Sequence, residues 1–414
     1  MRIVYISELF PPRIVGGAEI FAAALASAMA MTGMDVTVIT LGDSRQRTSA
    51  DRYVDGVKII QAYPWNIYYP YDGTKRSLPV RLAFHAWESV NLSAYRQTVT
   101  LLKSLEPDLV HTHNLGGFGE LAWLAAARLG IPIIHTAHDY HLLCPRRTLL
   151  RSHYTLCQAP RLACRIWRWW HLQTSRWPTV FVSPSRFLLE LHIRAGLQTK
   201  RSLVIPNGIP SLNERRSSRR ERRGAAKTFL FLGRLSPEKG VRVLLEAFKQ
   251  AAETAERSIH SVPRLVVAGK GPLAGLVTRY ASNSEVIRYV GFVSGSEKAP
   301  LLRYTDVVLI PSLWYENQPV AALEAWSLGI PVIASKIGAL GELIAQTEGG
   351  MLVPPGDADA LARAILRLAT DEETYMRYRE KALAAAQKYT LKECIATYEE
   401  LYRETLRYQP ARSS

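Results

Sequence analysis

The sequence of 414 residues is poor in cysteine, and its cysteines are not closely paired. They are Cys144, Cys157, Cys164 and Cys394, and no two of them are separated by only two residues. Zinc modules usually contain close pairs of ligands, and disulfide-stapled domains contain cysteine at a much higher density. We therefore expect free thiols and no disulfide framework.

Long hydrophobic runs are also missing from the sequence. The longest uncharged stretch, residues 20–34, is too short and too rich in small side chains to span a bilayer. The first residues reach an acidic side chain at Glu8, which is too early for a secretory signal peptide. Together these features predict a protein that is made and kept in the cytoplasm.

Acidic residues are outnumbered by basic ones. The sequence has 52 Lys and Arg against 36 Asp and Glu, a formal net charge of +16. Such an excess favours an anionic partner, which could be nucleotide phosphates, anionic lipid headgroups or nucleic acid. Residues 215–223 alone hold six arginines and one glutamate, a run that is typical of a solvated linker. No nucleic-acid-binding motif accompanies the charge, so we expect no nucleic acid partner.

What the sequence does contain is a regular alternation of apolar strands and helices. The predicted strands are residues 2–7, 35–41, 56–62, 108–113, 131–136, 179–183, 228–232, 264–268, 285–290, 306–311 and 330–335. The predicted helices are residues 18–31, 89–105, 119–129, 186–195, 241–252, 272–281, 297–303, 319–329, 357–369, 372–388 and 391–408. This alternation predicts α/β architecture with parallel, doubly wound sheets, whose ligands bind at the carboxyl ends of the strands.

The alternation pauses around residues 202–208 and then resumes, which predicts two Rossmann-like domains that face each other across a cleft. We expect an N-terminal domain over residues 1–205 and a C-terminal domain over residues 206–390. The last helix, within residues 391–414, should cross back to the N-terminal domain.

The strand–loop–helix unit of residues 306–335 carries the clearest functional pattern. Glu316 lies in its loop, Pro319 suits the first turn of the helix, and Glu324 follows about one turn later. Free amides at a helix start can bind phosphate oxygens, and the two carboxylates could accept hydrogen bonds from a sugar and a ribose. Two solvated glutamates near a helix start are the alternative.

Motifs at matching places in both halves resemble those of retaining nucleotide-sugar glycosyltransferases of family 4, which have the GT-B fold. They are Gly16-Gly17, VIPNG at residues 204–208, GRLSPEKG at residues 233–240, VAGKGPL at residues 267–273 and the E-x7-E pattern from Glu316 to Glu324. The resemblance covers nearly the whole chain. It implies transfer of a sugar from a nucleoside diphosphate to an acceptor hydroxyl, without a metal or other cofactor.

The resemblance also implies a role for individual residues. Arg234 and Lys239 would bind the diphosphate, Glu324 the ribose, and Glu316 the donor sugar. Surface salt bridges are the alternative for the two cations, and plain turns are the alternative for the glycines. The implied catalytic residues are Glu316 and His138. The implied donor-binding residues are Gly16, Gly17, Arg234, Lys239, Gly269, Gly271, Asn317, Gln318, Pro319, Val320 and Glu324.

His138 opens an H-D-Y segment that directly follows the predicted strand of residues 131–136. Family members with a similar segment place this histidine in the active-site cleft, so the resemblance implies that His138 contacts the sugar or orients the acceptor. A structural histidine at a strand end is the alternative. We expect Asp139 to cap the turn rather than to act as a base.

Five of the ten histidines fall within residues 111–141, so a metal site has to be considered. His111 and His113 would share one face of a strand. The gaps between the nearby cysteines do not match ordinary zinc modules, so we expect no metal. Whether a metal binds is left open for the further candidates Cys144, Cys157, Cys164, His153 and His171.

Residues 164–177 interleave arginine and tryptophan. Basic-aromatic segments suit a membrane interface, where the rings lie at headgroup level and the cations meet anionic lipid. A helix that packs its tryptophans inside the domain is the alternative. A second aromatic stretch, residues 63–71, suits either sugar stacking or a packed loop.

Together these features predict a retaining hexosyltransferase that uses a nucleotide sugar. The segment from His138 to Pro145 resembles bacterial surface-polysaccharide transferases, which implies a lipid-linked oligosaccharide acceptor and peripheral contact with the inner face of an anionic membrane. Two alternatives stay open. One is another GT-B enzyme, such as a sugar-phosphate glycosyltransferase or a nucleotide-sugar epimerase. The other is a non-catalytic basic protein that binds membranes.

Overall fold

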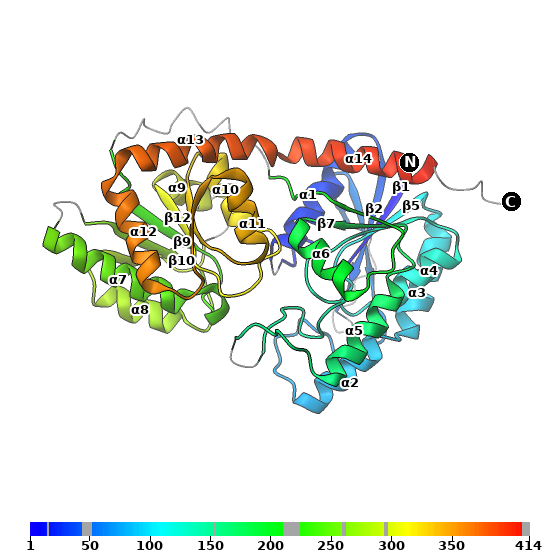
Figure 1. Cartoon of the computed structure of the whole chain (residues 1–414). Coiled ribbons are helices and arrows are strands. Elements are labelled where there is room, and N and C mark those ends of the chain that lie inside the picture. Colours follow the sequence, from blue (N-terminus) through cyan, green and yellow to red (C-terminus); the bar gives the residue numbers. More distant parts are fainter. Residues whose placement is uncertain are drawn as a thin grey trace. The chain divides into compact units, whose positions relative to one another are not determined.

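The computed structural model describes residues 1–14, 16–43, 52–151, 154–209, 224–258, 262–293 and 297–407 (Figure 1). It contains two compact units. The first consists of Met1–Thr148, Ala159–Asn207 and Cys394–Ser414, and the second of Leu149–Gln158 and Gly208–Glu393. The arginine-rich run of residues 215–223 and the metal candidate His153 lie outside the described residues.

The first unit is built on an eight-stranded sheet with the order β3-β4-β2-β1-β5-β6-β7-β8. Every neighbouring pair is parallel except β3 and β4. The strands are β1 Arg2–Ser7, β2 Asp35–Leu41, β3 Arg52–Val54, β4 Val57–Ala62, β5 Leu109–Thr112, β6 Ile133–Thr136, β7 Val180–Ser183 and β8 Arg201–Val204. Strands β5, β6 and β7 are buried along their whole length, as expected of a parallel sheet that is covered on both faces.

The helices of the first unit largely follow the sequence pattern. They are α1 Gly17–Met31, α2 Leu78–Glu88, α3 Leu92–Leu105, α4 Leu121–Arg128, α5 Leu162–Thr174 and α6 Arg186–Ala195. The helix that we expected over residues 89–105 begins later, at Leu92, because the Asn91 side chain caps it by accepting a hydrogen bond from the Ala94 amide. The sequence pattern did not predict α2, β3 or β8, and it offered a helix near α5 only as one of two interpretations of residues 164–177.

The second unit has a six-stranded parallel sheet with the order β11-β10-β9-β12-β13-β14. Its strands are β9 Thr228–Leu232, β10 Arg264–Ala268, β11 Ile287–Tyr289, β12 Val307–Ile310, β13 Val332–Ser335 and β14 Gly350–Val353. Its helices are η3 Pro237–Lys239, α7 Val241–Ser258, α8 Ala274–Ser282, α9 Lys298–Arg303, α10 Val320–Ser327, α11 Gly338–Thr347, α12 Ala358–Thr370 and α13 Glu372–Lys388.

Helices cover both faces of this second sheet. Phe229 and Phe231 of β9 belong to a buried cluster that includes α7 and α12, whereas Leu230 belongs to a second cluster that includes α10 and α13. Alternate residues of a strand point to opposite faces, so β9 anchors two hydrophobic layers at once. This confirms the doubly wound architecture that the sequence predicts.

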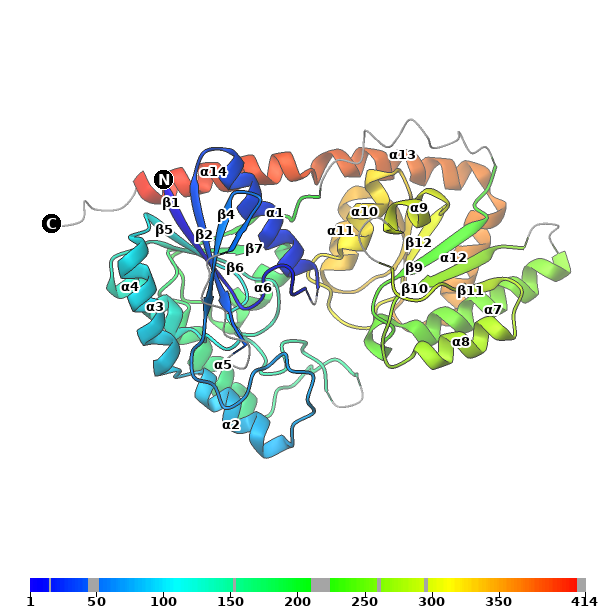
Figure 2. The same ribbon diagram turned by 180° about the vertical axis from the view of Figure 1, so that it is seen from behind.

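The last helix, α14 (Leu391–Arg407), packs on the first unit, as predicted (Figure 2). Its Tyr398 and Tyr402 share a buried cluster with Tyr5 of β1. The hydroxyl of Tyr402 lies 2.8 Å from that of Tyr5 and 2.7 Å from Nδ1 of His111. Within the described ranges, no helix is both long and apolar enough to cross a bilayer.

Candidate active site

The second sheet has a topological switch point between β9 and β12. These strands are neighbours in the sheet, although β10 and β11 lie between them in the sequence. Ligands of doubly wound sheets bind beyond the carboxyl ends of the strands at such a point. The GRLSPEKG motif follows β9, and the loop that carries Glu316 follows β12. The two motifs therefore meet at the position where this fold holds its ligands.

Lys239 and Glu316 join these two loops. Lys239 Nζ lies 2.7 Å from Glu316 Oε1 and 5.1 Å from the centre of the Trp314 ring. Ser312 Oγ and Trp314 Nε1 donate to the same carboxylate oxygen, at 2.7 and 2.9 Å. All three bonds end on Oε1, so none of these three partners competes with a ligand hydroxyl for Oε2 of Glu316.

The surroundings of Glu316 keep it ionised. Burial would raise the pKa of this carboxyl, but the nearby Lys239 charge and the three hydrogen bonds outweigh burial, so the pKa lies below its usual value. An ionised carboxylate only accepts hydrogen bonds. Glu316 is therefore suited to bind hydroxyl groups and unsuited to donate a proton.

Glu324 lies on α10 and is held by a second lysine. Lys298 Nζ, on α9, lies 3.1 Å from Glu324 Oε1 and 3.5 Å from Oε2. Both side chains are partly exposed. The ion pair fixes the direction of the Glu324 carboxylate, and it was not anticipated from the sequence.

Gly269 and Gly271 form a turn after β10 that packs against the GRLSPEKG loop. Their φ angles are +150° and +157°. A Cβ atom at Gly269 would lie 1.8 Å from the Gly233 carbonyl oxygen, and one at Gly271 would lie 2.4 Å from the Leu235 carbonyl oxygen. Close approach between two backbones therefore requires both glycines. Their predicted contact with a donor stays a prediction.

The remaining predicted donor residues lie around these loops. Arg234 is exposed and forms no ion pair with any residue that the structure describes. Gln318 is buried ahead of α10, and Asn317 is partly buried. Pro319 is the N-cap of α10 and Val320 its first residue, so Pro319 lies one position before the turn in which we expected it.

The first sheet has its own switch point, between β1 and β5. His113 directly follows β5, and its Nδ1 lies 2.9 Å from Nε2 of His138, which follows β6. Burial lowers the pKa of His138 from 6.5 to about 4, so the imidazole is neutral at pH 7 and can both donate and accept a hydrogen bond. Asp139 Oδ1 accepts from the His141 amide at 2.9 Å, as expected of a residue that caps the turn.

Gly16 and Gly17 lie at the start of α1, as the sequence predicts. The Gly16 amide donates to Glu19 Oε2 at 2.7 Å. The Glu19 carboxylate therefore already accepts a hydrogen bond from one of the amides that a helix start offers to an anion.

Two family descriptions match the chain in succession. Glycosyltransferase Family 4 matches residues 15–211, and Glycosyl transferases group 1 matches residues 213–384. The chain belongs to glycosyltransferase family 4. Along the sequence, the boundary between the two matches falls after the last strand of the first sheet and before the first strand of the second. Each description therefore corresponds to one Rossmann-like half of the glycosyltransferase.

Known relatives extend along most of this glycosyltransferase. An uncharacterized 42.6 kDa protein in the cps region of Klebsiella pneumoniae is 24% identical over 346 residues, 83% of this chain and 87% of that protein. The D-inositol 3-phosphate glycosyltransferase of Corynebacterium glutamicum is 26% identical over 408 residues, 94% of this chain and 92% of that protein. Anabaena HepE, solved in complex with UDP, superposes with a TM-score of 0.70 at 17% identity and covers 98% of this chain and 100% of its own. At that identity the similarity shows the shared GT-B fold.

Sequence reasoning missed a largely buried charge cluster in the first unit of the glycosyltransferase. Arg147 Nη1 lies 2.7 Å from Glu8 Oε2, just beyond β1, and Arg147 Nη2 lies 3.3 Å from Glu88 Oε1. Glu88 Oε1 also accepts from the Gly117 amide at 2.7 Å. These residues are far apart in the sequence and form no spacing pattern, so only the fold brings them to the carboxyl edge of the sheet.

The contacts of the aromatic stretch decide between its two interpretations. In the aromatic stretch of residues 63–71, Tyr68 stacks on Phe84 of α2 with ring centres 4.4 Å apart, and Trp65 packs edge-on against Trp87 at 4.6 Å. These contacts favour the packed-loop interpretation.

The four cysteines are free thiols. None of them joins the one described group of side chains that could hold a metal ion, Glu120, His141 and His171.

A hollow of about 1450 Å³ lies at the opposite edge of the second sheet. Its lining includes Thr228, Arg264 and Asp306, at or next to the amino ends of β9, β10 and β12. Parallel sheets of this class bind ligands at the carboxyl ends instead. We therefore do not place the substrate of the glycosyltransferase in this hollow.

Proposed function

We propose that the enzyme is a retaining glycosyltransferase that moves a hexose from a nucleoside diphosphate to an acceptor hydroxyl. The observation that carries this proposal is the Lys239–Glu316 pair at the switch point between β9 and β12. It places a cation, an ionised carboxylate and the start of α10 around one position, which matches a ligand with phosphates next to a sugar. The UDP in the HepE complex supports a uridine nucleotide as the donor.

Each group then has a chemical task. Arg234, which is exposed and forms no ion pair with any described residue, and Lys239 bind the diphosphate oxygens and stabilise the charge that develops on the leaving group. Oε2 of Glu316 accepts a sugar hydroxyl. Glu324, directed by Lys298, accepts the ribose hydroxyls. These cations and the α10 amides supply the positive charge, so we expect no requirement for a divalent metal.

The reaction follows by analogy with the family. The acceptor oxygen bonds to the anomeric carbon on the face from which the diphosphate leaves, and a departing phosphate oxygen takes the proton of the acceptor. The C–O bond to the diphosphate breaks with its electron pair going to the leaving group. His138, neutral at pH 7, would hold the acceptor or the sugar through one ring nitrogen.

We propose a lipid-linked saccharide as the acceptor, with the enzyme docked on the inner face of an anionic membrane. The match to a protein of a cps region supports a task in polysaccharide assembly. On α5, Leu162, Ile166 and Trp169 are 69%, 59% and 61% exposed, and they lie on one side of the helix. The alternative in which the tryptophans pack inside the domain therefore does not hold for Trp169.

Helix α2, which lies beside α5, also exposes apolar side chains. Both views show α2 and α5 side by side (Figures 1 and 2), and the rings of His85 and Trp167 lie 5.7 Å apart between them. Leu78 and Leu82 of α2 are also exposed. Arg161 and Arg165 are exposed beside the apolar residues of α5, which itself contains no acidic residue. Apolar side chains flanked by arginines, on a helix without acidic residues, match an anionic lipid surface.

A thermal-shift screen of UDP-, GDP-, ADP- and dTDP-sugars, with wild type beside Glu324→Ala, tests the donor site. At a hundred times its dissociation constant, the correct donor should stabilise wild type by about 2.7 kcal/mol and the variant by much less. Product analysis by NMR should then show the anomeric configuration of the donor retained. A folded wild type that none of these nucleotides stabilises, with or without acceptor, would overturn the proposal.

Phosphorylated acceptors are the second candidate, because the chain also matches a D-inositol 3-phosphate glycosyltransferase along 94% of its length. An acceptor screen that contains both lipid-linked saccharides and sugar phosphates distinguishes the two candidates. Transfer to a free sugar phosphate at rates that exceed those on any lipid-linked acceptor would favour the second.

A further inference from the structure

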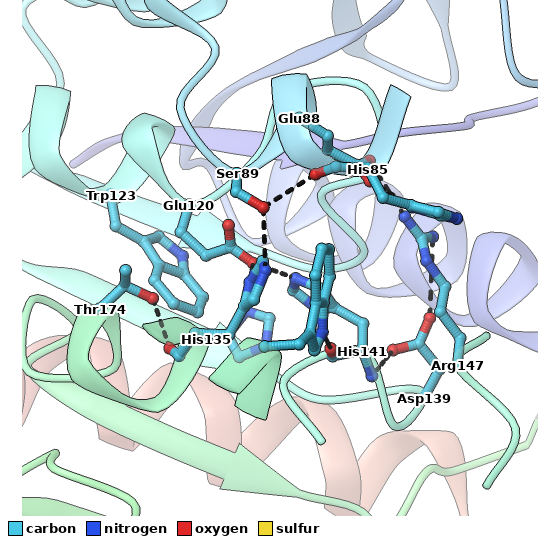
Figure 3. Close-up of polar contacts among 12 residues, drawn as sticks. His85, Glu88, Ser89, Glu120, Trp123, His135, Asp139, His141, Arg147 and Thr174 are labelled. Carbon is cyan, nitrogen blue, oxygen red and sulfur yellow. Dashed lines mark hydrogen bonds and ion pairs between the residues drawn. The ribbon is translucent and has the colours of Figure 1, made fainter. Parts of the chain in front are cut away.

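Glu120, His141 and His171 converge in the first unit and include none of the residues assigned to the reaction. Glu120 is the N-cap of α4, and His141 lies in the loop after β6 (Figure 3). His171 lies on α5. Both histidines contact the same carboxylate oxygen: His171 Nδ1 lies 2.6 Å from Glu120 Oε1, and His141 Nε2 also contacts it. One ligand atom from each residue lies within 4.8 Å of the others.

The cluster is enclosed by protein. The side chains of Glu120 and His171 are each 1% exposed, and that of His141 is 11% exposed. The second carboxylate oxygen, Glu120 Oε2, is buried and has no hydrogen-bond partner among the described residues. A charged oxygen left unpaired in the interior raises the free energy of the folded state, because it has lost its hydrogen bonds to water and has gained none from the protein. The carboxylate thus points to a missing partner.

We propose that Glu120, His141 and His171 bind a divalent transition metal, with zinc as the best match. Two imidazole nitrogens and one carboxylate are a donor set that zinc takes in proteins, whereas calcium and magnesium prefer oxygen ligands alone. Glu120 Oε2 would gain a partner as a bidentate ligand, or a water molecule would fill the fourth position. With bonds of about 2.1 Å, a tetrahedral ion separates its ligand atoms by roughly 3.4 Å, so a small side-chain rotation would admit it.

An outer contact of the cluster supports this assignment. The second ring nitrogen of His171, Nε2, lies 3.1 Å from Ser89 Oγ. Histidines that bind metals usually hydrogen-bond through their other nitrogen, which fixes the ring and its tautomer. Ser89 therefore acts as a positioning residue that keeps Nδ1 of His171 directed at the ion.

The metal would have a structural task. It would tie the start of α4, the loop after β6 and α5 to one point, and the loop also carries His138, three residues before His141. The ion would therefore hold the segment that presents His138 to the acceptor. This site is separate from the expected metal-free chemistry at Lys239 and Glu316, and it does not depend on the identity of the donor.

Metal analysis of the full chain tests the proposal. Protein purified after expression in zinc-supplemented medium should contain about one zinc per chain, and a chelator should lower its Tm. Glu120→Gln and His171→Gln should lose the zinc and the chelator effect. His192→Gln is the matched control, because His192 is equally buried in the first unit but lies outside the cluster. Ser89→Ala should weaken zinc binding by about 10–100-fold.

A second measurement keeps the test decisive if the ligand variants do not fold. Wild type stripped of metal and reloaded with Co²⁺ should develop the visible absorption of tetrahedral cobalt with nitrogen and oxygen ligands. Two results would overturn the proposal. One is wild type that holds no metal and whose Tm responds neither to zinc nor to a chelator. The other is His171→Gln that keeps a full equivalent of zinc.

Discussion

Lys239 Nζ and Glu316 Oε1 lie 2.7 Å apart although 77 residues separate them in the sequence. The lysine that we expect to bind the diphosphate therefore also holds the carboxylate that we expect to bind the sugar. Because β9 and β12 are adjacent, the two loops meet beyond the carboxyl ends of these strands. Binding of the donor would place the phosphate and the sugar on either side of this ion pair.

Removing Lys239 should therefore impair catalysis more than folding. We expect Lys239→Ala to lower kcat/KM by about 10²–10³-fold, the usual effect of deleting one donor to a developing negative charge. Steady-state kinetics with a saturating acceptor measures it. Lys249→Ala is the matched control, because Lys249 forms an exposed pair with Glu253 at 3.8 Å on α7. Equal activity in the two variants would remove Lys239 from the proposed mechanism.

Burial of His138 predicts a pH dependence of stability. Its pKa is 6.5 in the unfolded chain and about 4 in the folded chain, so between these values only the unfolded chain binds the proton. Stability should therefore fall as the pH falls below 6.5. From pH 6.5 to pH 5 one such histidine costs at most about 2 kcal/mol.

Urea unfolding of wild type and His138→Gln at pH 7 and pH 5 measures this effect. The variant should lose less stability than wild type over that interval. His113, 2.9 Å away, also has a strongly lowered pKa because it is buried, so the variant should keep part of the dependence. Parallel losses in the two proteins would show that His138 does not titrate as described.

Local sequence patterns predicted most of the fold. The bounds of β9, β10, α6 and α13 match the expectation residue by residue, because apolar runs and helical spacing are interrupted there by clear turn residues. Strand β8 was missed because it is a half-exposed edge strand that begins with Arg201. Strand β14 was missed because it begins with Gly350, which weakens the strand signal.

The sites were less predictable than the fold. The motifs identified Lys239, Glu316 and Glu324 as candidate site residues. They did not reveal that Lys239 pairs with Glu316 or that Lys298 holds Glu324. Both contacts depend on the order of strands in the sheet, which no local pattern encodes. Glu120 and His141 likewise lie on different elements, so their meeting is a consequence of topology.

The hydroxyl of Tyr402 connects α14 to the first sheet and should stabilise the fold. It lies within hydrogen-bond distance of Tyr5 and His111, and all three side chains are buried. Tyr402→Phe would leave a buried polar atom on each neighbour without this partner, at a cost of about 1–3 kcal/mol. Denaturant unfolding measures the change. Tyr53→Phe, at an exposed position on β3, should change stability by less than about 0.5 kcal/mol.

The exposed face of α2 and α5 should bind anionic vesicles. We expect wild type to sediment with vesicles that contain phosphatidylglycerol, and less so with neutral phosphatidylcholine or at high salt, because arginines next to the apolar residues attract the lipid charge. Trp169→Ala should weaken this binding by roughly tenfold, since a tryptophan that enters the interface removes a large apolar area from water. Arg165→Gln should weaken it by about fivefold, or 1 kcal/mol.

A matched control distinguishes binding by this face from nonspecific binding to the vesicles. Tyr304→Ala removes an aromatic ring that is as exposed as Trp169 but lies in the second unit, at the end of α9, and it should leave vesicle binding unchanged. If Tyr304→Ala and Trp169→Ala weaken binding equally, the attraction comes from the overall charge of +16 rather than from this face. If wild type does not sediment with anionic vesicles, the proposed docking surface is wrong. A lipid-linked acceptor would then have to reach the enzyme by another route.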